Sequence, residues 1–258
     1  LPDTMPVENP ALADAMSIDG PTLVPPGGNS RKQMRNAIKF IIAIIIAGLL
    51  MILFRCVAFT IYIVPKTGIK PWLVDGDRVL VNRWSYGLRT GSDKTFPYSR
   101  WFRKPVGKGE LVAFNYPLDT MHTVTKRSVH AAFCMAGPGD TTYVDHHPII
   151  PPKRCRMVEV KPWNIKLLCN TYRIHEGRKA DIKDGKLIVD GKATRYAYFS
   201  RNYYWMSAVD GDTTPDSRYY GFVPEDHIIG RIVMVVYSRG NSESFFGSFR
   251  NARWLMPL

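Results

Sequence analysis

The chain has 258 residues, enough for one sizeable domain or two small ones, and its 45% hydrophobic and 22% charged residues exclude wholesale disorder. With 35 Lys and Arg against 22 Asp and Glu, the net charge of +13 suits a polyanionic neighbour, either nucleic acid or an anionic lipid surface. The sequence contains no common nucleic-acid-binding motif, and a long apolar segment favours lipid. We therefore expect membrane lipids, and no nucleic acid, among the partners.

An apolar segment follows a proline-rich start. Residues 1–36 hold six prolines and cannot build a core, so we expect a flexible tail there. Residues 40–54 include no charged or strongly polar side chain, and with residues 55–59 they approach the length of a membrane span. A cleaved signal peptide would end in small residues and a core helix would show a polar stripe, and this segment has neither. Residues 37–59 are therefore predicted to form one transmembrane helix.

The charges around this segment predict its orientation. The flank after it begins with Arg55 and turns apolar, whereas four basic residues precede it: Arg31, Lys32, Arg35 and Lys39. The positive-inside rule therefore places the N-terminus in the cytoplasm and the C-terminal domain on the other side of the membrane.

Beyond residue 65 the patterns are those of strands. A short run at 186–189 lies between two Asp-Gly turns, which is a strong hairpin signal. The other candidate strands show alternation or many β-branched residues, and they are 77–83, 110–115 and 228–237, the last a central strand. No long stretch after residue 60 has a convincing helical period, so the predicted fold class is mainly β.

The cysteines and histidines do not predict a metal site or a definite disulfide. Cys155 and Cys169 could form a disulfide in an oxidising compartment or remain buried free thiols, and both alternatives are open. No Cys-x-x-Cys is present, and the pair His146-His147 lacks a third ligand at a useful spacing. We expect no metal and no other cofactor.

Aromatic and basic residues alternate in two segments, 99–104 (SRWFRK) and 245–254. Exposed Trp and Phe beside Arg and Lys are typical of the interfacial layer of a bilayer. Core aromatic residues with solvated charges nearby would give the same pattern, so both interpretations are open.

Several motifs occur in a fixed order after the apolar segment. They are YIVP at 62–65, LVDGD at 73–77, NRWSYG at 82–87, GELVAFNYP at 109–117, GPGD at 137–140 and DSRYYGFVPED at 216–226. In order and spacing, residues 38–258 resemble the bacterial type I signal peptidase family. Residues 202–205 and 245–254 look most like members from the Bacteroidetes.

In that family a Ser nucleophile is activated by a neutral Lys, an amine whose pKa is lowered by burial. The resemblance places Gly68 at the nucleophile position, where no side chain can attack, and Ile69 at the Met that follows. The ungapped general-base position is Ala132. Lys126 lies six residues too early and would need an insertion to fill that role.

The last motif is partly retained. Thr214 stands where the family has a Ser that supports the Lys, whereas Asp216, Ser217 and Arg218 are intact. These three residues imply that the scaffold is kept although the catalytic positions have changed.

The resemblance implies a membrane-anchored signal peptidase homologue that is catalytically inactive. Such a protein would bind signal peptides of exported proteins, or act as a partner or scaffold for an active signal peptidase or an envelope complex. The alternative is an active signal peptidase with displaced residues, Thr67 as nucleophile and Lys66, Lys70 or Lys126 as base. A one-residue shift along a strand turns a side chain to the opposite face, which argues against Thr67.

The expected domain organisation follows from these motifs. Residues 1–36 form a cytoplasmic tail, 37–59 the transmembrane helix, 60–133 with 208–258 the signal-peptidase-like core, and 134–207 an inserted, smaller β-rich subdomain. The expected location is the inner membrane, with a single span and the main domain in the periplasm.

Overall fold

The computed structural model describes residues 29–63, 69–91, 97–209, 215–240 and 249–258, without the side chains of residues 29–31 and 55–57. The chain divides into two compact units, Leu1–Ile52 and Leu53–Leu258. The first unit contains most of one long helix, and the second contains all the strands.

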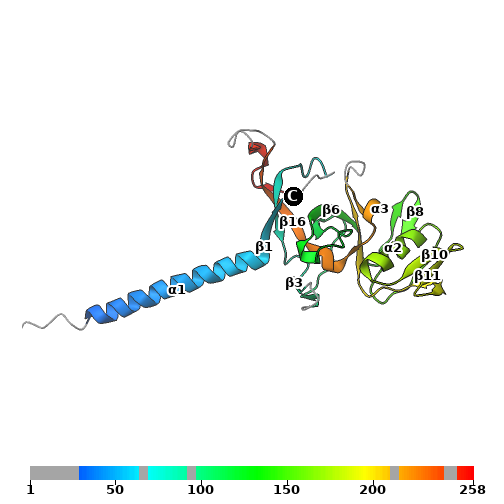
Figure 1. Cartoon of the computed structure of the whole chain (residues 1–258). Coiled ribbons are helices and arrows are strands. Elements are labelled where there is room, and N and C mark those ends of the chain that lie inside the picture. Colours follow the sequence, from blue (N-terminus) through cyan, green and yellow to red (C-terminus); the bar gives the residue numbers. More distant parts are fainter. Residues whose placement is uncertain (1–28, 64–68, 92–96, 210–214, 241–248) are drawn as a thin grey trace, which may run out of the picture. The chain divides into compact units, whose positions relative to one another are not determined.

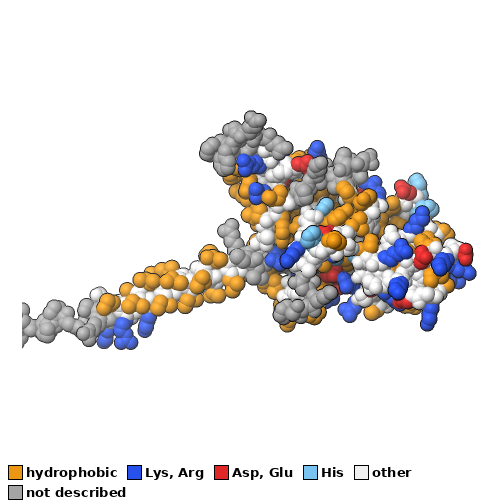
Figure 2. Space-filling model, in the orientation of Figure 1, with side chains coloured by type: hydrophobic (Ala, Val, Ile, Leu, Met, Phe, Trp, Pro, Cys, Tyr) orange, Lys and Arg blue, Asp and Glu red, His pale blue; other side chains and the backbone are white. Residues whose placement is uncertain are grey.

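Helix α1 (Asn29–Ala58) includes the predicted membrane span. It starts earlier than expected and takes in Lys32 and Arg35, because the residues around them are good helix formers. Between Lys32 and Phe54 it is long and apolar enough to cross a membrane once. Its apolar side chains are exposed along its length, with basic side chains near its start (Figure 2). An isolated helix satisfies its backbone hydrogen bonds internally, so α1 fits a single-pass membrane anchor.

The second unit is built on one antiparallel sheet (Figure 1). Its strands follow the order β1-β2-β16-β5-β6-β14-β15, and β17 also pairs with β16. The bounds are Phe59–Ile63 (β1), Asp77–Asn82 (β2), Leu111–Asn115 (β5), Val129–Ala136 (β6), Tyr203–Ser207 (β14), Val223–Pro224 (β15), Ile228–Ser238 (β16) and Met256–Pro257 (β17). The predicted strands at 77–83, 110–115 and 228–237 are confirmed, and the last is central.

Both faces of this sheet are covered, as the fully buried strand β5 shows. Leu111 and Ala113 face one cluster, which also contains Ile232 and Val235 of β16. Val112 and Phe114 face the opposite cluster, together with Tyr204 and Met206 of β14. Successive strand residues point to opposite faces, so neighbouring residues of β5 and β6 enter different clusters.

Short elements surround the sheet. The strands are Leu88–Thr90 (β3), Ser99–Trp101 (β4), Thr142–Val144 (β7), His147–Ile149 (β8), Val158–Glu159 (β9), Ala180–Lys183 (β10), Lys186–Val189 (β11), Lys192–Thr194 (β12) and Tyr196–Ala197 (β13). The helices are α2 (Ile165–His175) and α3 (Ser217–Tyr220), with 3-10 turns η2 (Val124–Lys126), η3 (Glu225–His227) and η4 (Asn251–Arg253). The predicted hairpin is confirmed, because β11 pairs with both β10 and β12.

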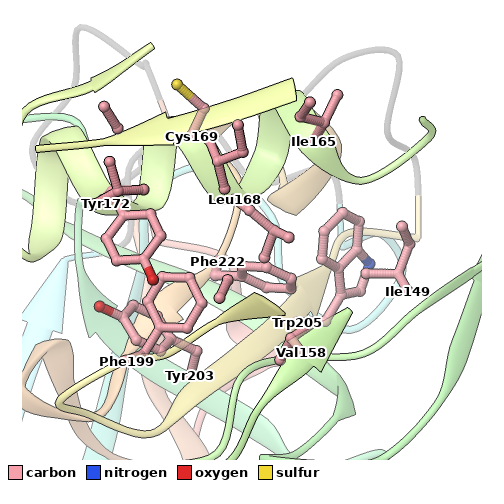
Figure 3. Close-up of a cluster of buried hydrophobic side chains, with 14 of the residues drawn as sticks. Ile149, Val158, Ile165, Leu168, Cys169, Tyr172, Phe199, Tyr203, Trp205 and Phe222 are labelled. Atoms are coloured by element: carbon pink, nitrogen blue, oxygen red, sulfur yellow. The ribbon is translucent and has the colours of Figure 1, made fainter. Parts of the chain in front are cut away.

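Helix α2 was not expected from the sequence. It buries Leu168 and Tyr172 in a cluster with Phe199, Trp205 and Phe222 (Figure 3). The rings of Tyr172 and Phe199 stack with their centroids 4.6 Å apart. Helix α2 has only 11 residues, so the helical spacing of its apolar residues is hard to recognise in the sequence. A helix this short depends on tertiary packing for its stability.

The fold is mainly β with one N-terminal apolar helix, as predicted. The cluster around α2 takes all its buried members but Phe222 from residues 136–205, which suits an inserted subdomain at 134–207. However, β14 lies in that range and pairs with β6 of the large sheet. The boundaries of the insertion therefore stay a prediction.

Candidate functional site

The segment after the nucleophile position is held against the large sheet. Gly68, Thr67 and Lys66 lie outside the described residues, and the next residue, Ile69, is fully buried. Ile69 belongs to the same core cluster as Leu73 and Ala131 of β6. This contact fixes the position of Ile69, the residue that follows the expected nucleophile position.

The LVDGD motif forms a buried turn rather than a catalytic feature. Gly76 has a φ of +89°, and a Cβ there would lie 1.9 Å from the carbonyl oxygen of Arg239, so only glycine fits. The fully buried carboxylate of Asp77 accepts hydrogen bonds from the backbone N–H of Val74 at 2.9 Å and from Arg253 Nη2 at 2.7 Å. The motif thus positions the chain beside the candidate site.

Ala132, the general-base position expected from the ungapped resemblance, carries only a methyl group. It lies on β6 opposite Val112, is 2% exposed, and shares a core cluster with Met206 and Tyr220. The adjacent residue, Ala131, points to the other face, toward the cluster of Ile69. The surroundings of Ala132 are apolar enough to hold a neutral amine, but the side chain carries no nitrogen.

Lys126 lies at a different place, in the turn η2 before β6, and its side chain is exposed. The turn is held by the neighbouring residue. Arg127 Nε donates to the carbonyl oxygen of His122 at 3.0 Å, and its Nη1 lies 2.7 Å from His227 Nε2. Lys70, another candidate base, is also exposed.

The Asp216-Ser217-Arg218 motif joins α3 to β14. Asp216 caps α3 by accepting from the backbone N–H of Arg218, and its carboxylate forms an ion pair with Arg218 Nη2 at 2.9 Å. Ser217 Oγ accepts from the backbone N–H of Met206 at 2.9 Å. All these bonds support the scaffold. Thr214 lies outside the described residues.

Strand β6 has a free edge near Ala132. Among the described residues, β14 pairs with β6 only from Phe133 onward, whereas β5 pairs along Val129–Phe133 as well. Cys134 donates its N–H to the Glu110 carbonyl and Ser128 accepts from Tyr116, so even-numbered residues of β6 bond toward β5. Hydrogen-bonding direction alternates along an antiparallel ladder, so Val129 and Ala131 direct their N–H and C=O groups away from β5. An extended peptide could pair there.

The sequence did not reveal a buried charged network next to this edge. Asp226 lies 2.6 Å from Arg201 Nη1 and 3.0 Å from His227 Nδ1, and His227 Nε2 faces Arg127. Burial alone would raise the pKa of Asp226, but the His227 hydrogen bond and the nearby cations hold it at about 2. Since arginine only donates, His227 Nε2 must accept, and its Nδ1–H donates to Asp226. The motif at 216–226 gave no signal of these distant partners.

The remaining sequence alternatives are resolved in the described residues. Cys155 is exposed, Cys169 lies on the buried face of α2, and both are free thiols, so the possible disulfide is not formed. His147 stacks on the ring of Trp163 with centroids 5.4 Å apart, and His146 is exposed.

Comparison with known proteins assigns the chain to a family. A sequence model described as signal peptidase, peptidase S26, matches residues 37–237. Signal peptidase I of Aquifex aeolicus is 24% identical over 243 residues, covering 80% of this chain and 85% of that protein. Signal peptidase I of Buchnera aphidicola from Acyrthosiphon pisum is 23% identical, covering 70% of this chain and 69% of its own length. The family match covers most of the chain and includes most of α1, the large sheet apart from β17, and the Asp216 motif. The chain therefore belongs to the signal peptidase family, peptidase S26.

Proposed function

We propose that this chain is a membrane-anchored signal peptidase homologue that binds signal peptides without hydrolysing them. The observation that carries this proposal is the buried methyl group of Ala132, the residue that the family resemblance aligns with the general base. The same resemblance aligns a glycine, Gly68, with the nucleophile. Hydrolysis by this family needs a hydroxyl and a neutral amine within hydrogen-bond distance. Neither position supplies its group.

The position of Lys126 supports the same conclusion. A lysine acts as a neutral base where burial disfavours its charged form. Lys126 is exposed, and Arg127 ties its turn to η3 through His227. For the Lys126 amine to reach the position of Ala132, the contact between Arg127 and His227 would have to break.

The free edge of β6 supports peptide binding. Among the described strands, none pairs with Val129 and Ala131 on the side away from β5, and β1, at the end of the sheet, pairs only with β2. Adding a strand to such an edge gives affinity through backbone bonds and specificity through alternate side-chain pockets. The edge of β6 therefore supports the proposal of peptide binding by strand addition.

The cellular setting is part of the same proposal. The basic residues before the apolar helix support a main domain on the periplasmic side of the inner membrane. The motifs at 202–205 and 245–254 favour an origin in the Bacteroidetes. A partner role beside an active signal peptidase or an envelope complex remains compatible with a bound, uncut signal peptide.

The second candidate function is an active peptidase that uses Thr67 with Lys66, Lys70 or Lys126. It is favoured only by the presence of a hydroxyl next to position 68. Thr67 and Lys66 lie outside the described residues.

The first test is cleavage of a signal-peptide substrate by the full chain in detergent micelles. We expect no turnover above that of the substrate alone, and no change in the variants Thr67→Ala and Lys126→Ala. The double variant Gly68→Ser/Ala132→Lys returns both groups to their family positions, and we expect it to gain measurable cleavage. Robust turnover by the natural chain that either alanine variant abolishes would overturn the inactive assignment.

The second test measures binding of an uncleaved signal peptide to the full chain. Val129→Pro removes one outward N–H at the first residue of β6, where proline is tolerated, and should weaken binding about fivefold, the value of one hydrogen bond. Lys192→Ala, on β12, is the matched control and should bind normally. Saturable binding that is insensitive to Val129→Pro would exclude the β6 edge, and no binding at all would favour a scaffold role.

A further inference from the structure

The aromatic-basic segment at 99–104 buries one of its cations, Arg100, and exposes both of its aromatic rings. Arg100 on β4 is only 8% exposed, whereas Trp101 is 61% exposed and Phe102 is 79% exposed. The interpretation of this segment as core aromatics with solvated charges is therefore wrong. An exposed aromatic pair beside a buried cation needs another explanation.

The backbone around Gly87 holds this arrangement in place. Gly87 has a φ of +96°, and a Cβ there would lie 2.3 Å from the carbonyl oxygen of Trp101 and 2.7 Å from that of Phe102. The β3–β4 hairpin can therefore pass closely over Gly87 only because it lacks a side chain. This close approach fixes both aromatic residues at the surface, beside the base of the β3–β4 hairpin, where Trp101 pairs with Leu88 (β3 is labelled in Figure 1).

Arg100 is anchored so that it contributes to a pocket. Its Nε donates to Tyr98 Oη at 3.0 Å, and its Nη2 donates to the carbonyl oxygens of Glu225 and Ile228. Neutral oxygens accept these bonds, so they leave the positive charge of the guanidinium uncompensated. Arg100 then lines a cavity of about 260 Å³.

The cavity carries an excess of positive charge. Its charged lining residues are Arg100, Arg103, Lys104, Lys153 and Glu225. Glu225 already accepts from Asn202 Nδ2 at 2.9 Å and lies 3.7 Å from Arg103 Nη1. Among the described residues, Lys104 and Lys153 form no ion pair. Tyr86 and Tyr204 add an apolar wall. A buried arginine and two unpaired lysines around one cavity suit a phosphate group.

We propose that this cavity binds the phosphate of an anionic membrane lipid. Inorganic phosphate has the same charged chemistry, and the neighbouring residues decide between the two sources. Trp101 and Phe102 are adjacent in sequence to Arg100, Arg103 and Lys104, and exposed aromatic rings beside cations suit the bilayer interface. The same chain carries an apolar helix fit for a membrane, which keeps lipid at high local concentration.

The test is a titration of the full chain in neutral detergent micelles with a short-chain phosphatidylglycerol. Binding should be saturable, weaker at high salt, and at least several-fold tighter than binding of the matching phosphatidylcholine. Lys104→Ala and Lys153→Ala should each weaken it about fivefold, the effect of one cation near an anionic lipid. Lys179→Ala removes an exposed cation before β10 and is the matched control, with unchanged affinity.

Two further variants separate lipid from free phosphate. Trp101→Ala and Phe102→Ala should weaken lipid binding and leave any binding of inorganic phosphate unchanged. Equal affinities for inorganic phosphate and lipid, both insensitive to Trp101→Ala, would overturn the lipid assignment in favour of a free anion. Equal losses in Lys153→Ala and Lys179→Ala would show general charge attraction and overturn the site itself.

Discussion

At the scale of single residues, the buried histidines give this domain a defined response to acid. Burial lowers the pKa of His175 to about 3, with a further contribution from the neighbouring His227. Burial also lowers the pKa of His227, against the opposing effect of Asp226. Both rings are therefore neutral in the folded protein under conditions where an unfolded histidine, with a pKa of about 6.5, becomes charged.

The first prediction concerns stability at mildly acidic pH. The unfolded chain binds more protons than the folded chain below about pH 6.5, so the free energy of unfolding should fall as pH falls from about 6.5 to about 4. The slope should reach about 1.4 kcal/mol per pH unit for His175, and His227 should add to it in the same direction. Asp226 adds its own loss only below about pH 4, where an unfolded aspartate becomes protonated.

Urea unfolding of the full chain in neutral detergent, followed by tryptophan fluorescence, measures this slope. His175→Gln removes one titrating ring and should flatten the dependence. His146→Asn changes an exposed histidine with a φ of +64°, a conformation that Asn tolerates, and should leave the slope unchanged. A natural chain equally stable at both ends of the window would contradict the assignment of neutral, buried rings.

At the scale of elements, the strands could be predicted from the sequence and α2 could not. Residues 77–83, 110–115 and 228–237 have side chains that match the two faces of one sheet, and the two Asp-Gly turns adopt positive φ at Asp184 and Asp190, as a hairpin requires. These signals are local. In contrast, Asn164 before α2 makes no side-chain cap, and its Oδ1 instead accepts from the backbone N–H of Lys161 at 2.8 Å. The Asn164 side chain, which would usually cap the start of the helix, instead stabilises the turn that precedes it.

The second prediction follows from that dependence on packing. Leu168 is 1% exposed in the cluster with Phe222, so Leu168→Ala should lower the free energy of unfolding by about 3 kcal/mol through lost burial and a residual cavity. Lys166→Ala, two residues earlier and on the exposed side of α2, should change it by less than about 0.5 kcal/mol. Urea unfolding of both variants gives the comparison. A small effect of Leu168→Ala would mean that α2 is not held by its buried face.

At the scale of the whole molecule, family membership could be predicted from the motifs. Whether another lysine could reach the general-base position could not. Asp77 and Asp216 each accept hydrogen bonds from backbone N–H groups a few residues away. Because these contacts are local, the motifs can be recognised in the sequence. Whether Lys126 could replace Ala132 depends on where η2 lies, and that is set by Arg127 meeting His227 a hundred residues later. The aromatic-basic segment was ambiguous for a similar reason, since only the close approach over Gly87 turns Trp101 outward.

The last prediction tests the orientation of the chain, which the basic flank before α1 implies. Cys155 is an exposed free thiol, whereas Cys134 and Cys169 are buried, and burial raises the pKa of the Cys134 thiol to about 12. Since the thiolate is the reactive form, a membrane-impermeant maleimide should label the main domain at Cys155. Labelling is done in a Cys56→Ala background, with Cys155→Ser as the negative control. If the main domain lies outside the cytoplasm, intact spheroplasts and lysed cells should label equally. Labelling only after lysis would place the domain in the cytoplasm, away from exported signal peptides, and would remove the setting in which a non-cleaving peptide binder makes sense.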